Sequence, residues 1–173
     1  MAAHPDDEVI GAGALLPYLR DVRIIHTTNG SPRDLGDAMR SGFVTREEYA
    51  FARRRECECA MTTAGVPPGS STCLGYTDQE AIYHLDELCG RLAEEFARLE
   101  PDVVLTQPYE GGHPDHDATA FAVDRCFAWS GQVFEMTSYH SCEGELVTGT
   151  FLPGDEAVAI RDLSEQDASR KQK

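Results

Sequence analysis

The sequence predicts an α/β protein built on a mainly parallel β-sheet flanked by helices. Short apolar stretches rich in β-branched residues alternate with longer amphipathic stretches, which is typical of strands followed by covering helices. The chain has 173 residues, of which 41% are apolar, and it contains no internal repeat or low-complexity linker. We therefore expect residues 1–173 to form a single domain with a sizeable core.

The first half of the chain gives a strand, a loop and a long helix. Val22–Thr28 is β-branched and leads into Asn29–Pro32, whose residues favour a turn. The segment 30–42 has the composition of a long loop, and such loops often contact substrates. A helix is predicted over Thr45–Val66, because Thr45 and Glu48 form a capping box and a glycine followed by two prolines marks the end.

The second half continues this alternation. Apolar side chains spaced three or four residues apart predict an amphipathic helix over Tyr83–Pro101. Helical spacing resumes over Pro114–Trp129, where the proline suits a first turn. A fully buried strand is expected at Asp102–Pro108, and further strands at Ser71–Tyr76, Gln132–His140 and Glu156–Ile160.

The composition argues against several classes of partner. Thirty acidic side chains against fifteen Lys and Arg give a formal charge of −15, which repels nucleic-acid phosphates and anionic membrane surfaces. No apolar run reaches the length of a membrane span, and the start of the chain lacks the pattern of a signal peptide. None of the six cysteines forms a C-x-x-C pair. We expect a cytoplasmic protein with reduced thiols, no nucleic-acid partner and no membrane insertion.

Two similar clusters of histidine and acid carry the chemistry. "HPDD" begins at His4, and "HPDH" begins at His113, directly after a predicted strand. Ligands bind beyond the carboxyl ends of the strands in α/β sheets, so both clusters are expected on the same edge. Catalytic zinc takes three protein ligands and keeps a fourth position for water. Two ligands from one loop and one from the other give a His-Asp-His site, which leaves Asp6 and Asp115 as supporting residues or bases.

The two H-P-D clusters also have other interpretations. A single H-P-D is common, and an acidic chain start is usually solvated, so either cluster alone is weak. Two histidines with one carboxylate also describe an iron oxygenase site. Because such oxygenases commonly have antiparallel β-sandwich folds, the alternation of strands and helices favours hydrolysis.

Three motifs resemble those of a known family. "AHPDDE" at Ala3–Glu8, "TNG" at Thr28–Gly30 and "GHPDHDA" at Gly112–Ala118 are similar, in order and spacing, to the motifs of the PIG-L / LmbE-like zinc-dependent N-acetylglucosaminyl deacetylases. Similarity extends through the helix at Arg53–Val66 to the segment Val158–Lys173. The resemblance implies a Rossmann-like fold and a zinc hydrolase that removes an acetyl group from a small amino-sugar conjugate.

The same resemblance implies roles for particular residues. His4, Asp7 and His116 would bind one zinc ion per chain, with Fe²⁺ or another divalent metal as the alternative. Asp6 would be the general base, and His113 the charged partner that steadies the oxyanion and protonates the leaving amine. Asp115 would orient a histidine, and Arg53 would contact sugar hydroxyls.

We expect structural roles for several residues near these motifs. His26, within an apolar strand, is expected to be structural, as are His84 and His140, which we place on the surface. Glu8 is expected to cap the helix that follows it.

The sequence departs from the family at both ends. The apolar strand before "AHPDDE" is reduced to three residues, and the last helix looks cut after about two turns. We therefore expect a truncated first strand and a domain shortened at both ends. This motivates a second hypothesis, a metal-binding domain that is catalytically silent. The sequence leaves the particular amino-sugar conjugate and the oligomeric state open.

Overall fold

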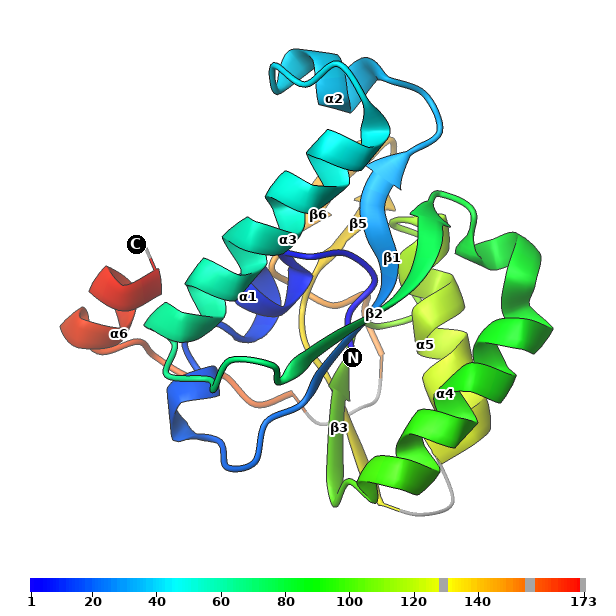
Figure 1. Cartoon of the computed structure of the whole chain (residues 1–173). Helices are drawn as coiled ribbons and strands as arrows, with labels where there is room; N and C mark the ends of the chain where they lie inside the picture. The colour runs from blue at the N-terminus through cyan, green and yellow to red at the C-terminus, as the bar shows by residue number, and fades with distance from the viewer. Residues whose placement is uncertain (128–130, 155–157, 172–173) are drawn as a thin grey trace.

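The computed structural model describes residues 1–127, 131–154 and 158–171 (Figure 1). The sheet-forming segments and helices alternate through most of the chain. In order they are α1 (Asp7–Ala12), η1 (Leu16–Tyr18), β1 (Ile24–Pro32), α2 (Gly36–Arg40), α3 (Arg46–Thr63), β2 (Ser71–Asp78), η2 (Ala81–His84), α4 (Leu85–Leu99), β3 (Val103–Thr106), α5 (Pro114–Phe127), β4 (Gln132–Glu135), β5 (Tyr139–Cys142), β6 (Glu145–Thr148) and α6 (Glu165–Lys171).

Among the described residues the strands form three pairs, and two of these pairs are parallel. β1 pairs with β2 and β3 pairs with β4, both in parallel, whereas β5 and β6 form an antiparallel hairpin. Helices α1 and α3 cover one side of the parallel strands, and α4 and α5 cover the other (Figure 1). The predicted α/β class with parallel strands between helices is confirmed.

The first three residues lie between the two parallel pairs. Ala2 forms a parallel bridge with His26 of β1, and its backbone N–H donates to the carbonyl of Ile25 at 2.9 Å. On the other side, the Met1 nitrogen donates to the carbonyl of Leu105 in β3 at 2.8 Å. The short segment before His4 is therefore held as part of the sheet, at the position marked N in Figure 1.

Two apolar cores lie on opposite sides of β1. Ile24 packs with Met61 of α3, whereas the next residue, Ile25, packs with Leu92 of α4. Successive side chains of a strand point to opposite faces, so this pair shows that β1 is covered on both sides. Because both faces of the sheet are covered, a polar site is expected at the ends of the strands.

The helices agree with the sequence patterns that predicted them. Helix α3 begins after Thr45, whose hydroxyl accepts a hydrogen bond from the Glu48 backbone N–H at 3.2 Å, as the capping box requires. In α4 the side chains Leu88, Leu92 and Phe96 are buried on one face. Both predicted helices are thus confirmed.

The turn predicted at Asn29–Pro32 is wrong. Strand β1 continues through these residues and pairs Pro32 with Asp78, after register irregularities around Thr28. The segment 30–42 is consequently not a long loop, because the end of β1 and helix α2 occupy most of it. Long-range pairing with β2 overrides the local turn preference of these residues.

Later strands also differ from expectation. β3 is only partly buried, with Val103 50% exposed, and Gln132–His140 divides between β4 and the start of β5. The strand predicted at Glu156–Ile160 lies partly outside the described residues, and positions 158–160 have no regular structure. Within the described ranges, no helix combines the length and apolar character needed to cross a bilayer.

Candidate metal centre and active site

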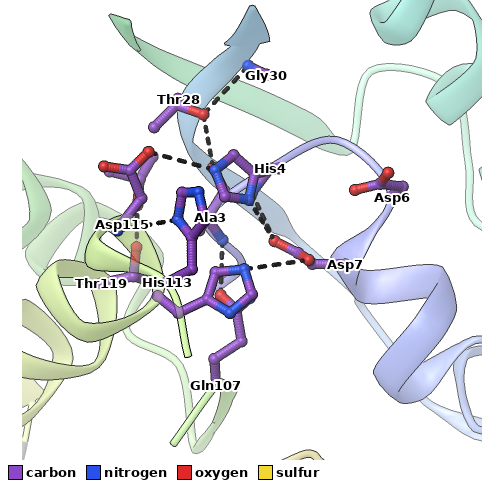
Figure 2. Close-up of polar contacts among 12 residues, drawn as sticks. Ala3, His4, Asp6, Asp7, Thr28, Gly30, Gln107, His113, Asp115 and Thr119 are labelled. Atoms are coloured by element: carbon purple, nitrogen blue, oxygen red, sulfur yellow. Dashed lines mark hydrogen bonds and ion pairs between the residues drawn. The ribbon is translucent and has the colours of Figure 1, made fainter. Parts of the chain in front are cut away.

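The two predicted clusters meet at one end of the parallel strands. The His4 loop follows the bridge at Ala2, and the Ala3 N–H donates to Oε1 of Gln107 at 2.8 Å, directly after β3. Helix α5 then carries the second cluster, and Figure 2 shows the side chains of His4 and His113 beside each other. The ring centroids of His4, His113 and His116 lie 4.7–5.2 Å apart.

The carboxylate of Asp7 contacts both His4 and His116. Nδ1 of His4 lies 3.1 Å from Oδ2 of Asp7, and Nε2 of His116 lies 3.5 Å from Oδ1 of the same carboxylate. All three residues are buried. The carboxylate of Asp7 therefore lies between two imidazoles that come from different parts of the chain.

The buried ring of His116 has a nitrogen without a hydrogen-bond partner. Among the described residues, none hydrogen-bonds to its Nε2, although the ring is 2% exposed. Its other nitrogen, Nδ1, lies 3.3 Å from the hydroxyl of Ser138. A hydrogen bond from Nδ1 to Ser138 leaves the lone pair of Nε2 available toward Asp7, as a metal ligand requires.

Asp115 anchors this end of the site from inside. It is fully buried, and its carboxylate accepts hydrogen bonds from the backbone N–H groups of Gln79 at 2.6 Å and Ala81 at 3.0 Å. It also lies 3.2 Å from Nε2 of His4. A carboxylate at Nε2 orients the ring and leaves Nδ1 facing Asp7.

Asp78 belongs to the same cluster and was missed in the sequence. Its Oδ1 lies 3.1 Å from Nε2 of His4 and 3.9 Å from Nε2 of His113. Asp78 ends β2, where no histidine or second acid stands beside it to indicate a site. Its place follows from the pairing of Asp78 with Pro32 at the end of β1.

The charges in this cluster favour a cation. Although burial alone would lower it, the contacts with Asp115, Asp7 and Asp78 raise the pKa of His4 to about 11. Burial likewise opposes ionisation of Asp7, but the nearby imidazoles of His116 and His4 bring the pKa of that carboxyl well below its usual range. Buried carboxylates persist when a cation offsets their charge, so the donor set and the unpartnered imidazole nitrogen fit a divalent metal ion.

His113 differs electrostatically from His4. Burial lowers the pKa of His113 below its ordinary value, and the positive charge of His4 lowers it further. Nδ1 of His113 accepts a hydrogen bond from the Asp115 backbone N–H at 3.2 Å. The neutral ring thus carries its proton on Nε2, so His113 offers an N–H donor rather than a positive charge.

Asp6 and Arg53 form a separate pair at the edge of the site. Nη2 of Arg53 lies 2.7 Å from Oδ2 of Asp6, whose side chain is 53% exposed. Figure 2 shows the Asp6 carboxylate apart from the histidines and the adjacent Asp7 turned toward them. Arg53 also donates to the carbonyls of Gly30 at 2.6 Å and Pro5 at 3.2 Å, so three groups already engage its guanidinium.

The backbone at Asp6 is unusual. Its φ of +155° with ψ of −26° is a conformation that costs a residue with a side chain about 1–3 kcal/mol. Partial burial raises the pKa of the Asp6 carboxyl, whereas the charge of Arg53 acts in the opposite direction. A carboxylate with a raised pKa is a stronger base, which suits a group that accepts a proton.

Two expectations about neighbouring residues are corrected. His140 is 3% exposed rather than on the surface, because its Nδ1 lies 3.4 Å from the buried carboxylate of Glu110. Glu8 is not the N-cap residue of α1, which is Asp6, and capping is not its main contact. Instead the Glu8 carboxylate is buried against His26, so His26 is the structural residue that was expected.

The fold and this cluster define a class of protein, an α/β protein with a buried histidine–aspartate site at the strand ends. Residues 1–127 match the family model described as PIG-L: GlcNAc-PI de-N-acetylase. The chain therefore belongs to the PIG-L family, as the resemblance of its motifs indicated.

Particular relatives support this placement. A Bacillus subtilis (strain 168) protein named as a probable N-acetyl-α-D-glucosaminyl L-malate deacetylase 2 is 30% identical over 129 residues, covering 70% of this chain and 56% of that one. The structure of N,N'-diacetylchitobiose deacetylase from Pyrococcus horikoshii is 29% identical with a TM-score of 0.54, covering 75% of this chain and 48% of that one.

A third comparison concerns the fold alone. The structure of a deacetylase triple mutant from the teicoplanin biosynthetic pathway has a TM-score of 0.73 at 19% identity, covering 99% of this chain and 77% of that one. The chain spans about half the length of the curated relatives it matches, at 56% and 46%.

Proposed function

We propose that this protein is a metal-dependent N-deacetylase that hydrolyses the acetamide of a small amino-sugar conjugate. The observation that carries the proposal is the buried group of His4, Asp7 and His116, in which Nε2 of His116 has no hydrogen-bond partner among the described residues. The family membership of the chain and the names of its relatives supply the reaction type and the substrate class.

The three residues His4, Asp7 and His116 would hold the metal ion, which we take to be one Zn²⁺ per chain. When bound, zinc acidifies water and polarises a carbonyl oxygen. Two nitrogens and a carboxylate oxygen are ligands that zinc accepts, and they leave one position for substrate or water. Asp115 supports the set by holding the ring of His4 from its far nitrogen.

The remaining residues would move protons and orient the substrate. Asp6 accepts a proton from the attacking water, whose oxygen adds to the carbonyl carbon of the acetamide. The neutral ring of His113 donates a hydrogen bond from its Nε2–H to the carbonyl oxygen as negative charge develops there, and it keeps its proton. Asp6 then returns the proton to the nitrogen, the C–N bond breaks, and acetate and the free amine leave.

In this scheme Arg53 acts on Asp6 first, and the contact with sugar hydroxyls that the sequence suggested is secondary. Its guanidinium is 15% exposed and already contacts Asp6, so in the resting arrangement it fixes the base. A contact with sugar hydroxyls requires the substrate to share or replace one of these bonds.

The proposal is tested by acetate release from a panel of N-acetylglucosamine conjugates, using protein loaded with one equivalent of Zn²⁺. His116→Ala removes a ligand, and we expect loss of both bound zinc and turnover. Asp6→Asn keeps the ligands, and we expect retained zinc with turnover reduced by about 100-fold or more. His84→Ala is the matched control, because His84 is exposed and outside the cluster.

Three outcomes would overturn the proposal. Full zinc content and turnover in His116→Ala would remove the basis for the ligand assignment. Stoichiometric zinc without acetate release from any conjugate would favour the catalytically silent metal-binding domain. Oxygen consumption during turnover would instead favour the oxygenase alternative.

A further inference from the structure

A second buried polar cluster lies beneath the turn that carries Asp6. Glu8 of α1, His26 of β1 and Cys57 of α3 are 5%, 2% and 5% exposed. Nε2 of His26 lies 2.8 Å from Oε2 of Glu8, and the Cys57 thiol donates to Oε1 of the same carboxylate at 3.4 Å. One carboxylate thus joins three elements of the fold.

The cluster has the residue types of a metal site but is complete without an ion. Its three donor atoms lie within 4.8 Å of one another. Each of them already has a partner inside the cluster, since the imidazole and the thiol both donate to the carboxylate. This contrasts with His116, whose Nε2 has no hydrogen-bond partner among the described residues. A buried network that satisfies itself serves to fix geometry.

Glu8 also reaches the catalytic turn. Its Oε2 accepts a hydrogen bond from the backbone N–H of Asp6 at 3.3 Å, in addition to the one from His26. The same Asp6 N–H also donates to the carbonyl oxygen of His4 at 3.0 Å. Because the φ of Asp6 is +155°, the surrounding contacts must hold this residue in a conformation that it would not adopt alone.

The partners of Glu8 sit on rigid parts of the fold. His26 lies within β1, between the bridge to Ala2 and the pairing with Cys73 of β2. Cys57 packs with Met61 in the core between α3 and β1. Helix α1, by contrast, has only six residues and depends on such contacts for its position.

We propose that Glu8, clamped by His26 and Cys57, is a positioning residue that fixes the Asp6 backbone and thereby aims the general base. The inference rests on the proposed function, in which Asp6 takes the proton of water. In the proposed function Glu8 touches neither substrate nor metal, and it acts only through Asp6.

The test compares two replacements of His26. His26→Leu keeps a bulky side chain on β1 but removes the donor to Glu8, whereas His26→Gln supplies an amide N–H in its place. We expect His26→Leu to lower kcat about 10- to 100-fold, with KM and bound zinc unchanged. His26→Gln should recover most of the loss. Cys57→Ala, which removes the donor from α3, should lower kcat in the same direction by a smaller factor.

A second readout does not depend on turnover. The backbone amide resonance of Asp6 in the ¹⁵N spectrum of the metal-free chain should shift in His26→Leu and return toward its wild-type position in His26→Gln. If these shifts occur while the wild-type chain releases no acetate, the proposed function fails and the positioning role stands. Wild-type kcat and an unmoved Asp6 amide in His26→Leu would overturn the positioning role alone.

Two further results would also overturn it. Equal loss of kcat in His26→Leu and His26→Gln, in proportion to a lower unfolding midpoint, would assign the cluster a purely structural role. A thiolate-to-metal absorption band in the Co²⁺-loaded chain that disappears in Cys57→Ser would show that the cluster binds metal. The ligand group of His4, Asp7 and His116 contains no sulfur, so it cannot give that band.

Discussion

Arg53 holds the carboxylate of Asp6 at 2.7 Å, while the neighbouring Asp7 turns to the opposite side and faces His4 and His116. Two consecutive acids therefore receive different partners and different chemistry. Asp7 lies between two imidazoles in the interior, and Asp6 stands half exposed beside a guanidinium. In the proposed function, this division separates a metal ligand from a proton acceptor within one turn of the chain.

The first prediction concerns the guanidinium. Arg53→Ala releases Asp6 and the carbonyls of Pro5 and Gly30, so we expect kcat to fall about 10- to 100-fold with little change in KM. Arg53→Lys should recover little, because one ammonium cannot reproduce the planar three-way contact. Arg54→Ala is the control, since Arg54 is exposed and pairs with Glu58 on the helix surface. A raised KM with unchanged kcat would instead show that Arg53 acts on the sugar.

Local chemistry explains what the sequence predicted well. The hydroxyl of Thr45 and the N–H of Glu48 lie three residues apart, so the start of α3 depends on neighbours alone. The burial of Leu88 and Leu92 follows from helical spacing. The meeting of the two H-P-D clusters follows from the rule that parallel strands end at one edge.

Long-range contacts explain the features of the site that the sequence did not predict. Asp78 enters the cluster because β1 runs on through Pro32 and carries β2 with it, which no pattern near either residue indicates. His140 is buried because Glu110, thirty positions away, supplies a carboxylate. Ser138 faces His116 for a similar reason, since β5 returns against the start of α5. Partners distant in the chain cannot be read from local spacing.

A second prediction concerns stability. Asp115→Ala leaves the backbone N–H groups of Gln79 and of buried Ala81 without this acceptor, so we expect the free energy of unfolding to fall by about 3 kcal/mol. Urea unfolding of the metal-free chain measures this change. The control is Asp124→Ala on the exposed face of α5, which should change stability by less than about 0.5 kcal/mol. Equal effects of the two substitutions would contradict the anchoring role of Asp115.

The third prediction concerns the loop that carries the second cluster. A Cβ on Gly112 would collide with the carbonyl oxygen of Tyr139, so Gly112→Ala must displace the loop before His113. We expect a loss of zinc affinity of at least about tenfold, measured by competition with a chelating dye. Gly111→Ala is the matched control. Gly111 has a φ of +73° but open space around it, so its substitution should cost only about 1–2 kcal/mol of backbone strain and leave affinity near wild type.

A fourth prediction follows from the hydroxyl beside His116. Ser138→Ala removes the contact at Nδ1, which orients the ring and leaves Nε2 available to a metal. We expect zinc affinity to fall about tenfold, within the range seen when such supporting hydrogen bonds are lost. Ser141→Ala, at an exposed position of β5, should have no effect. Unchanged affinity in Ser138→Ala would mean that packing against Tyr139, whose ring centroid lies 5.0 Å away, orients the imidazole instead.

The last prediction is a pH dependence at Cys57. Burial, together with the negative charge of Glu8, raises the pKa of this thiol to about 12 from an ordinary value of 9.0. The folded chain therefore keeps Cys57 protonated at pH 8, and because only the thiolate is nucleophilic, iodoacetamide should leave it unmodified. Exposed Cys59 and Cys142 should react first, as peptide mass spectrometry will show.

The sign of the linked stability change follows from the same shift. A pKa that is higher in the folded than in the unfolded chain stabilises the fold fully below pH 9, and this contribution is lost progressively as the pH rises from about 9 to about 12. Cys57→Ser should weaken that alkaline loss, because a hydroxyl does not ionise in this range. Alkylation of Cys57 at pH 8 as fast as that of Cys59 in the folded chain would contradict both the burial and the protonation state inferred for the thiol.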